Sequence, residues 1–328
     1  MIRTTVVSSL IAVLLLLASP PTLSFTSQKS AGKAFDYSDQ SVQKTPDWTK
    51  KPIVYDKWAQ NADLAVTLDQ HLYDIMLPLV QKFARDNDMD IAVNEGTCGI
   101  SSGMLENKHV DIAGFCCPAG RGDRLPGLEF HTVGVAPLAI IAHKDNTVSG
   151  ITAEEARGLF SGSIRNWKEV GGADMEVSPI ARLHCKARPG HWRLILDTED
   201  DFAYHLNEVG TIPDMAHEVS SNRQAVGHIA TWNIHKYADK WKVKALLIDG
   251  LRPDDTGALM KGKYPFFRSY NITTWSGSNS NEKAQRLVRY LIENAGRVDS
   301  RFNMVPVSKL REAGWKFKGD ELVGEPGK

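Results

Sequence analysis

From residue 64 onward, the hydrophobic residues of this chain fall alternately at strand-like and helix-like spacings. Residues 64–66 form a short apolar run typical of a strand. Residues 69–86 carry apolar positions three and four apart, which indicates an amphipathic helix. Asp69 is expected to cap this helix through its side-chain oxygen. Pro78 lies inside the helical pattern and lacks an amide hydrogen, so we expect it to kink or split the helix.

The same alternation continues to the end of the chain. Further strands are predicted at residues 90–94, 111–114, 133–142, 244–248 and 266–275, and further helices at residues 101–107, 153–160 and 281–294. Strands that alternate with helices are typical of a largely parallel sheet covered by helices. The sequence therefore predicts an α/β fold.

The first 24 residues have the pattern of a secretory signal peptide. Arg3 supplies a positive charge, and residues 6–18 are apolar apart from two serines. This run is too short for a comfortable membrane span, although a retained N-terminal anchor is the alternative. We therefore expect a periplasmic or extracellular protein. Residues 25–61 are polar and contain prolines, which predicts an extended N-terminal arm.

Length and charge restrict the class of protein. The roughly 300 residues after the signal suit two lobes better than one small core. Lys plus Arg and Asp plus Glu both number 39, so the formal net charge is zero. Nucleic-acid binding would require a basic excess and is not expected.

The four cysteines all lie in glycine-containing loops, next to predicted strand ends. They are Cys98, Cys116, Cys117 and Cys185. Export permits disulfides, and four cysteines allow three complete pairings, so two structural bridges are one interpretation. Free thiols without a shared role are another. We favour a third interpretation, in which the thiols meet at one ligand site.

Five segments carry a resemblance to a known family. They are residues 110–114, 137–141, 151–172, 225–228 and 264–268. The stretch 151–172, with its core Phe-Ser-Gly-x-Ile-x-Asn-Trp, is the most specific of them. The chain resembles the phosphate-type periplasmic solute-binding proteins of ABC transporters over roughly residues 62–310.

The resemblance implies a type II periplasmic-binding-protein fold, with two α/β lobes, a hinge and a central ligand cleft. We expect one lobe to comprise residues 62–142 and 266–315, and the other residues 143–265, followed by a C-terminal tail at 316–328. Ligand binding would close the lobes, and a permease or a sensor kinase would recognise the closed state. No catalytic triad or nucleophile motif is visible, so an enzyme is not expected.

The loops that bind the ligand in this family differ here. The family grips an oxyanion with Ser, Thr and Arg side chains, because an oxyanion accepts hydrogen bonds and carries charge. In this chain the Thr position holds Cys98, and a Ser-Arg pair is replaced by Cys116 and Cys117. The helix start that follows Cys185 contains His191. The ligand-binding residues implied by the resemblance are Thr67, Gly96, Thr97, Cys98, Gly99, Cys116, Cys117, Cys185, His191 and His228.

Thiols in place of hydroxyl groups change the expected ligand. A thiol is a weak donor, whereas sulfur and imidazole together suit Cu(I), Zn(II), iron or trivalent arsenic. The expected metal ligands are Cys98, Cys116, Cys117, Cys185 and His191, with a nearby arginine (Arg121, Arg188 or Arg193) favouring the thiolates. We therefore expect a receptor for a thiophilic metal or metalloid.

Two alternatives stay open. The first is a phosphate or oxyanion receptor of an ABC transporter whose cysteines are structural. The second is a periplasmic redox protein that carries a metal or haem, although the absence of a Cys-x-x-Cys-His motif argues against covalent haem. The identity of any cofactor is unknown from the sequence. The other histidines, His71 among them, are interpreted as surface or packing residues.

Overall fold

The computed structural model describes residue 35 and residues 41–182, 195–196, 202–237 and 239–327. All of these belong to one compact unit, Ala31–Lys328. The expected signal peptide lies outside the described residues. Within the described part of the chain, no helix is both long and apolar enough to cross a membrane.

The bounds of the elements follow the predicted alternation of strands and helices. The α-helices are α1 (Pro46–Lys50), α2 (Gln70–Asp86), α3 (Cys98–Glu106), α4 (Ala153–Ser161), α7 (Ile212–Ser221), α8 (Thr231–Tyr237), α9 (Thr256–Met260), α10 (Glu282–Asn294) and α11 (Val307–Glu312). The strands are β1 (Leu64–Asp69), β2 (Ile91–Gly96), β3 (Ile112–Phe115), β4 (Leu128–His143), β5 (Gly150–Ile151), β6 (Ser178–Arg182), β7 (Asn207–Val209), β8 (Ala225–Ala230), β9 (Val243–Ala245), β10 (Leu247–Ile248), β11 (Phe267–Trp275), β12 (Val305–Pro306), β13 (Lys316–Lys318) and β14 (Glu321–Gly324).

One large sheet organises these elements. Its strands are ordered β2-β1-β3-β11-β4-β8-β6-β7, and β9 and β12 also pair with β4. β2, β1 and β3 are parallel, whereas β11 is antiparallel to both β3 and β4. The carboxyl ends of β2, β1 and β3 therefore meet at one edge of the sheet.

Local signals set the ends of the two helices that start at this edge. Asp69 accepts a hydrogen bond from the His71 amide and caps α2, as predicted. The helix continues through Pro78, so the predicted split is wrong. Six buried apolar side chains along α2 hold it against the core, which offsets the missing hydrogen bond. Thr97 caps α3, which begins at Cys98 and not at residue 101 as predicted.

The hydrophobic core falls into separate clusters that share β4. One cluster includes Val133 and Ala136 with side chains of β1, α2, β3 and α10. A second includes Val135 and Leu138 with side chains of α4, α9 and α11, and a third joins Ala139 to α7. The lobe boundaries expected from the sequence stay a prediction.

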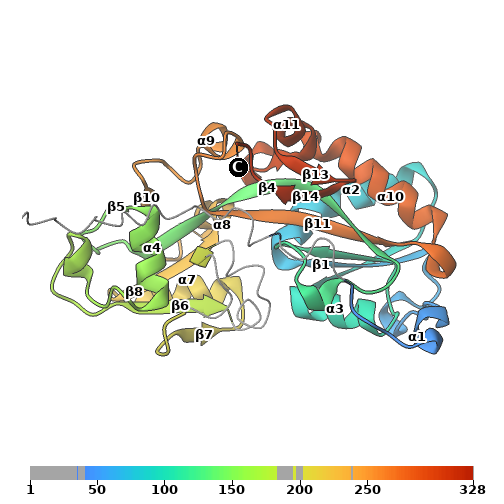
Figure 1. The fold of residues 1–328 in the computed structure, drawn as a ribbon, viewed down its shortest axis with the longest axis horizontal. Coiled ribbons are helices and arrows are strands. Elements are labelled where there is room, and N and C mark those ends of the chain that lie inside the picture. Colours follow the sequence, from blue (N-terminus) through green and yellow to red (C-terminus); the bar gives the residue numbers. More distant parts are fainter. Residues whose placement is uncertain (1–34, 36–40, 183–194, 197–201, 238, 328) are drawn as a thin grey trace, which may run out of the picture. The chain divides into compact units, whose positions relative to one another are not determined.

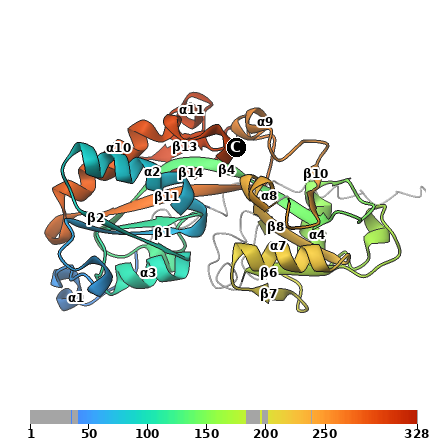
Figure 2. The ribbon, with the colours of Figure 1, turned by 180° about the vertical axis from the view of Figure 1, so that it is seen from behind.

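The ribbon views show how β4 and β11 connect the parts of the sheet. Both strands extend from the group of β1, α2, α3 and α10 toward the group of β6, β8, α4 and α7 (Figures 1 and 2). α3 lies on one side of β1, and α2 and α10 pack together on the other. The two long strands thus connect these two groups of elements.

Part of the expected N-terminal arm contacts the core. Residues 41–61 contain α1 and a single helical turn, Lys57–Ala59. The Val42 amide donates to the Arg124 carbonyl, and the Trp48 indole donates to the Glu106 carbonyl. This part of the arm is therefore docked and not fully extended.

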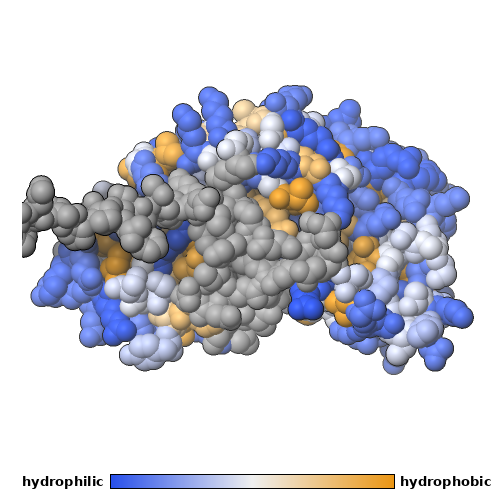
Figure 3. Space-filling model, viewed as in Figure 1, coloured by the Kyte–Doolittle hydropathy of each residue, from blue (hydrophilic) through white to orange (hydrophobic). Residues whose placement is uncertain are grey.

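The described surface on one face of the molecule is mainly polar. On the face shown in Figure 3, hydrophilic side chains cover most of the described surface, and hydrophobic ones form small separate areas. The described residues of this face therefore offer no broad apolar surface.

Candidate functional site

Three loops at the carboxyl edge of the parallel strands bring thiols and charges together. β1 ends at Asp69 where α2 begins, β2 leads through Thr97 to Cys98 at the start of α3, and β3 is followed by Cys116 and Cys117. Ligands of open α/β sheets bind outside the carboxyl ends of the strands. The predicted meeting of these three cysteines is therefore a direct result of the strand order.

The sulfur atoms form a tight, buried cluster. Cys116 Sγ lies 3.5 Å from Cys98 Sγ and 3.7 Å from Cys117 Sγ, and the three sulfurs lie within 4.8 Å of one another. The Cys98 thiol donates to Asp69 Oδ2 at 3.4 Å. Asp69, His71 and Cys116 form a second group whose ligand atoms also lie within 4.8 Å of one another. Cys116 is the member that the two groups share.

Two buried arginines add positive charge. Arg268, from β11, donates from Nη1 to Cys116 Sγ at 3.3 Å. Arg182, the last residue of β6, donates from Nη2 to Gln70 Oε1 at 2.9 Å, and its Nη1 lies 3.1 Å from His71 Nε2. Both arginine side chains are completely buried. The site therefore combines sulfur ligands with two permanent cations.

Charges and hydrogen bonds shift the pKa values of the three cysteines in different directions. Burial alone raises the pKa of Cys116, but hydrogen bonds from Cys117 and Cys98 and the charge of Arg268 bring that pKa well below its usual value. Hydrogen bonding to Cys116 raises the pKa of both Cys98 and Cys117 well above the usual value. Within the cluster, Cys116 is therefore the cysteine that loses its proton most readily.

Asp69 responds to the same surroundings. Burial, followed by the charge of Cys116, raises the pKa of the Asp69 carboxyl from 3.8 to about 7. Arg182 and Arg268 oppose this shift. Asp69 therefore exchanges its proton near neutral pH.

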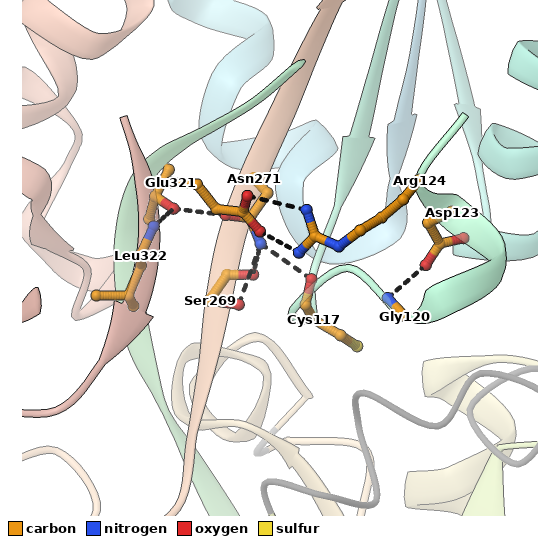
Figure 4. Close-up of polar contacts among 9 residues, drawn as sticks. Cys117, Gly120, Asp123, Arg124, Ser269, Asn271, Glu321 and Leu322 are labelled. Carbon is orange, nitrogen blue, oxygen red and sulfur yellow. Dashed lines mark hydrogen bonds and ion pairs between the residues drawn. The ribbon is translucent and has the colours of Figure 1, made fainter. Parts of the chain in front are cut away.

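A network of hydrogen bonds fixes the loop that carries Cys116 and Cys117. Asn271 of β11 donates to the Cys117 carbonyl oxygen at 2.9 Å and also contacts Ser269 (Figure 4). Thr132 of β4 donates to Asn271 Oδ1 at 2.6 Å. The thiols are thus held by the strands that connect the core clusters.

The chain beyond the cysteines is anchored as well. Asp123 accepts from the Gly120 amide at 2.9 Å and from the Ser102 hydroxyl at 3.3 Å. Arg124 forms a two-point ion pair with Glu321 of β14 (Figure 4). The loop therefore has little freedom to move away from the sulfur cluster.

The structure places the other predicted site residues as follows. Thr67 is buried in β1, with its hydroxyl 3.5 Å from Ser101 Oγ, and Gly96 ends β2. Thr97 is occupied in capping α3, and Gly99 is exposed in its first turn. His228, in β8, is buried edge-on against Phe160, with ring centroids 5.7 Å apart, and belongs to neither ligand group of the described residues.

Cys185 and His191 lie outside the described residues, so their predicted roles stay predictions. Cys98, Cys116 and Cys117 are free thiols. A two-disulfide arrangement would join two of these three to each other, and the described part of the chain contains no such bridge.

Sequence reasoning missed four important residues of the site. Asp69 is predicted only as a helix cap, and His71 is interpreted as a surface or packing residue, yet both are buried beside Cys116. Neither Arg182 nor Arg268 is predicted to be a charged residue of the site, because nothing in their local sequence shows that they are buried. Arg121, one of the arginines predicted to favour the thiolates, is exposed, and Arg268 has this role.

Comparisons with known proteins agree with this architecture. Two curated relatives, both phosphate-binding proteins PstS, resemble the chain in sequence. The one from Bacillus subtilis is 26% identical over 215 residues, which cover 63% of this chain and 68% of that protein. The one from Staphylococcus saprophyticus is 22% identical over 278 residues, which cover 77% and 83%.

Solved structures resemble the chain in fold. An ABC-type phosphate transport receptor from Vibrio cholerae has a TM-score of 0.60 at 23% identity, and covers 74% of this chain and 99% of its own. A putative phosphate ABC transporter substrate-binding protein from Clostridium perfringens, with bound phosphate, has a TM-score of 0.64 at 17% identity and the same coverage. The profile of the PBP superfamily domain matches residues 54–294. The chain therefore belongs to the PBP superfamily and has the periplasmic-binding-protein fold that its sequence predicts.

Proposed function

We propose that the protein is an exported solute receptor that binds a small oxyanion of the phosphate type beside Arg182 and Arg268. The family, together with relatives that are phosphate-binding proteins, supports a binding role and an anionic ligand of this kind. The sequence analysis favours a thiophilic metal or metalloid, with an oxyanion as the alternative. The comparisons and the buried arginines favour the oxyanion instead.

Arg182 is the observation that carries the proposal. Its side chain is completely buried, and its Nε has no hydrogen-bond partner. Its described partners are the neutral Gln70 amide and the His71 ring, and no carboxylate among the described residues forms an ion pair with it. A buried guanidinium without an anionic partner is costly. A bound oxyanion would supply both the missing charge and the missing acceptor.

Helix termini add to the attraction for an anion. α3 begins at Cys98 and α2 begins at Gln70, so the amino ends of both helices lie at the site. Backbone amides and the partial positive charge of a helix amino end favour bound anions. The amino ends of two helices and the side chains of two arginines therefore all favour an anion at this site.

Arg182 also suggests how binding is signalled. It belongs to β6, whereas its partners Gln70 and His71 belong to α2, which packs in the first core cluster. An oxyanion held by Arg182 and by the start of α3 would add contacts across this connection and favour the closed arrangement. A permease would then recognise the closed receptor.

Calorimetry tests the proposal directly. Full-length protein, reduced and treated with chelator, is titrated with inorganic phosphate and, separately, with sulfate. We expect phosphate binding, and a loss of affinity of about tenfold or more in Arg182→Gln and Arg268→Gln, because each removes a charged donor. Arg223→Gln is the control, since Arg223 is exposed. Unchanged affinity in both buried-arginine variants would contradict the proposal.

A thiophilic metal or metalloid is the second candidate ligand. The observation that favours it is the group of three buried sulfurs within 4.8 Å of one another. An oxyanion accepts hydrogen bonds, and thiols are weak hydrogen-bond donors, so the three cysteines would add little to its affinity. Metal uptake by the chelator-treated protein would favour this candidate, and phosphate uptake alone would favour the first.

A further inference from the structure

The three sulfurs have the spacing of ligands that share one ion. Two thiolates bound to the same tetrahedral zinc ion, with Zn–S bonds of about 2.3 Å, lie about 3.8 Å apart. The measured separations are 3.5 Å for Cys98 and Cys116 and 3.7 Å for Cys116 and Cys117. A central ion would thus need only small shifts of these side chains.

We propose that Cys98, Cys116 and Cys117, with Asp69 as the fourth ligand, bind one soft divalent cation of the zinc type in tetrahedral geometry. The inference rests on the second candidate function and names the class of its ligand. It shares Arg182 and Arg268 with the oxyanion proposal, but its test is read from the thiols.

Asp69 is suited to be the fourth ligand because its two oxygens have different tasks. Oδ1 accepts from the His71 amide at 2.9 Å and caps α2. Oδ2 lies 3.4 Å from Cys98 Sγ, although Asp69 is not among the three groups that lie within 4.8 Å of one another at the sulfur cluster, so its side chain would have to shift toward Cys117 to complete the site. Carboxylate oxygen is an ordinary zinc ligand, and a protein site with four ligands is closed to water.

His71 is the competing fourth ligand. Its Nε2 lies 3.1 Å from Arg182 Nη1. An arginine can only donate, so Nε2 must be the acceptor in this contact and its lone pair is directed at Arg182. The geometry therefore favours Asp69 over His71.

With all four proposed ligands ionised, the charges of the buried groups balance with a divalent ion. Three thiolates and the Asp69 carboxylate carry four negative charges. Arg182, Arg268 and a divalent cation carry four positive charges. A monovalent ion such as Cu(I) would leave one buried negative charge without compensation, which is unfavourable in a buried site. Metal ligands are commonly oriented by hydrogen bonds from residues that do not bind the metal themselves. Arg268 would have this role, because it donates to Cys116 Sγ at 3.3 Å.

Cobalt(II) is the probe that tests the site. Full-length protein is reduced, stripped with chelator and titrated with Co²⁺ under anaerobic conditions, and Zn²⁺ is then added. We expect one cobalt per chain, with a sulfur-to-cobalt charge-transfer band and the visible bands of a tetrahedral ion, both abolished by zinc. No such bands at one equivalent of cobalt, in protein that circular dichroism shows to be folded, would overturn the inference.

Variants assign the ligands. Cys98→Ser, Cys116→Ser and Cys117→Ser should each weaken the charge-transfer band and lower the affinity at least tenfold. Asp69→Asn keeps the helix cap and the sulfur band but should lower affinity, whereas His71→Gln should not. The opposite result for Asp69→Asn and His71→Gln would overturn the assignment of Asp69. Loss of the sulfur band in Cys185→Ser would overturn the proposed ligand set.

The experiment separates this inference from the oxyanion proposal. Phosphate binding is measured with the metal-free protein and depends on the arginines, whereas cobalt binding is measured without phosphate and depends on the thiols. A failed cobalt titration leaves the phosphate result unaffected, and the reverse is also true.

Discussion

Asp69 links the folding of α2 to the chemistry of the site. One carboxylate oxygen caps the helix, and the other faces the Cys98 thiol. Because the side chain is completely buried next to Cys116, its ionisation is opposed by burial and by the neighbouring sulfur. The proton on Asp69 is therefore coupled to the stability of the whole unit.

The stability of the metal-free protein should fall as pH rises from about 4 to about 7. The pKa of Asp69 is raised in the folded protein from 3.8 to about 7, so the folded state binds this proton more tightly than the unfolded state. This contribution is fully present below pH 4 and is lost as pH approaches 7, at a rate on the order of 1 kcal/mol per pH unit. Urea unfolding in the presence of chelator measures the slope.

Asp69→Asn should flatten this slope, because asparagine keeps the capping oxygen but does not titrate. Asp86→Asn, at an exposed position of the same helix, should leave the slope unchanged. A slope that persists in Asp69→Asn would assign the pH dependence to another group.

At the scale of single residues, the sequence predicts the thiols but not their charged neighbours. Cysteine is rare and its chemistry is visible from its identity. Arg182 reaches a histidine 111 positions away, and Arg268 reaches a cysteine 152 positions away. Such pairs depend on the strand order, which no local pattern encodes.

At the scale of elements, Asn271 connects the cysteine loop to the sheet. Its side chain contacts the Cys117 carbonyl, Ser269 and Thr132, all of them buried. Asn271→Ala should lower the free energy of unfolding by about 1–3 kcal/mol, because it leaves buried polar groups without partners. It should also weaken ligand binding, because the loop would no longer be fixed.

Thr152→Ala provides the matched control for Asn271→Ala. Thr152 caps α4 through a reciprocal capping box with Glu155, in the second core cluster. Its loss should cost about 1 kcal/mol and leave ligand affinity unchanged. Chemical denaturation and calorimetry on both variants make the comparison. Equal loss of affinity in both would show that general destabilisation, and not the loop, controls binding.

The elements themselves are predicted well, because their signals are local. Asp69 caps α2 where the sequence indicates, and β11 begins one residue after its predicted start. The start of α3 is missed because Thr97 and Cys98 precede the apolar pattern. Pro78 does not split α2, because tertiary packing of the helix outweighs a local preference, and the predicted kink stays a prediction.

At the scale of the whole molecule, Arg182 is the polar connection between β6 and the start of α2. Loss of this side chain should make local opening of β6 and of the start of α2 more frequent. Arg182→Ala should increase amide hydrogen exchange at the first turn of α2 and in β6, and leave α10 unchanged, since the hydrogen-bond partners of Arg182 lie in the first two residues of α2 and not in α10. Exchange measured by mass spectrometry, with and without phosphate, tests this. Equal exchange in both proteins would show that Arg182 does not connect the segments.

The position of β11 between β3 and β4 also has a consequence for the order of folding. Strands β1 to β4 are made early, but their sheet is complete only when residues 267–275, more than 100 positions later, insert between β3 and β4. Arg268 and Asn271, which hold Cys116 and its loop, arrive with this strand. The three thiols therefore stay uncovered in any folding intermediate in which β11 has not yet inserted. The thiols are therefore most exposed to oxidants before β11 is in place.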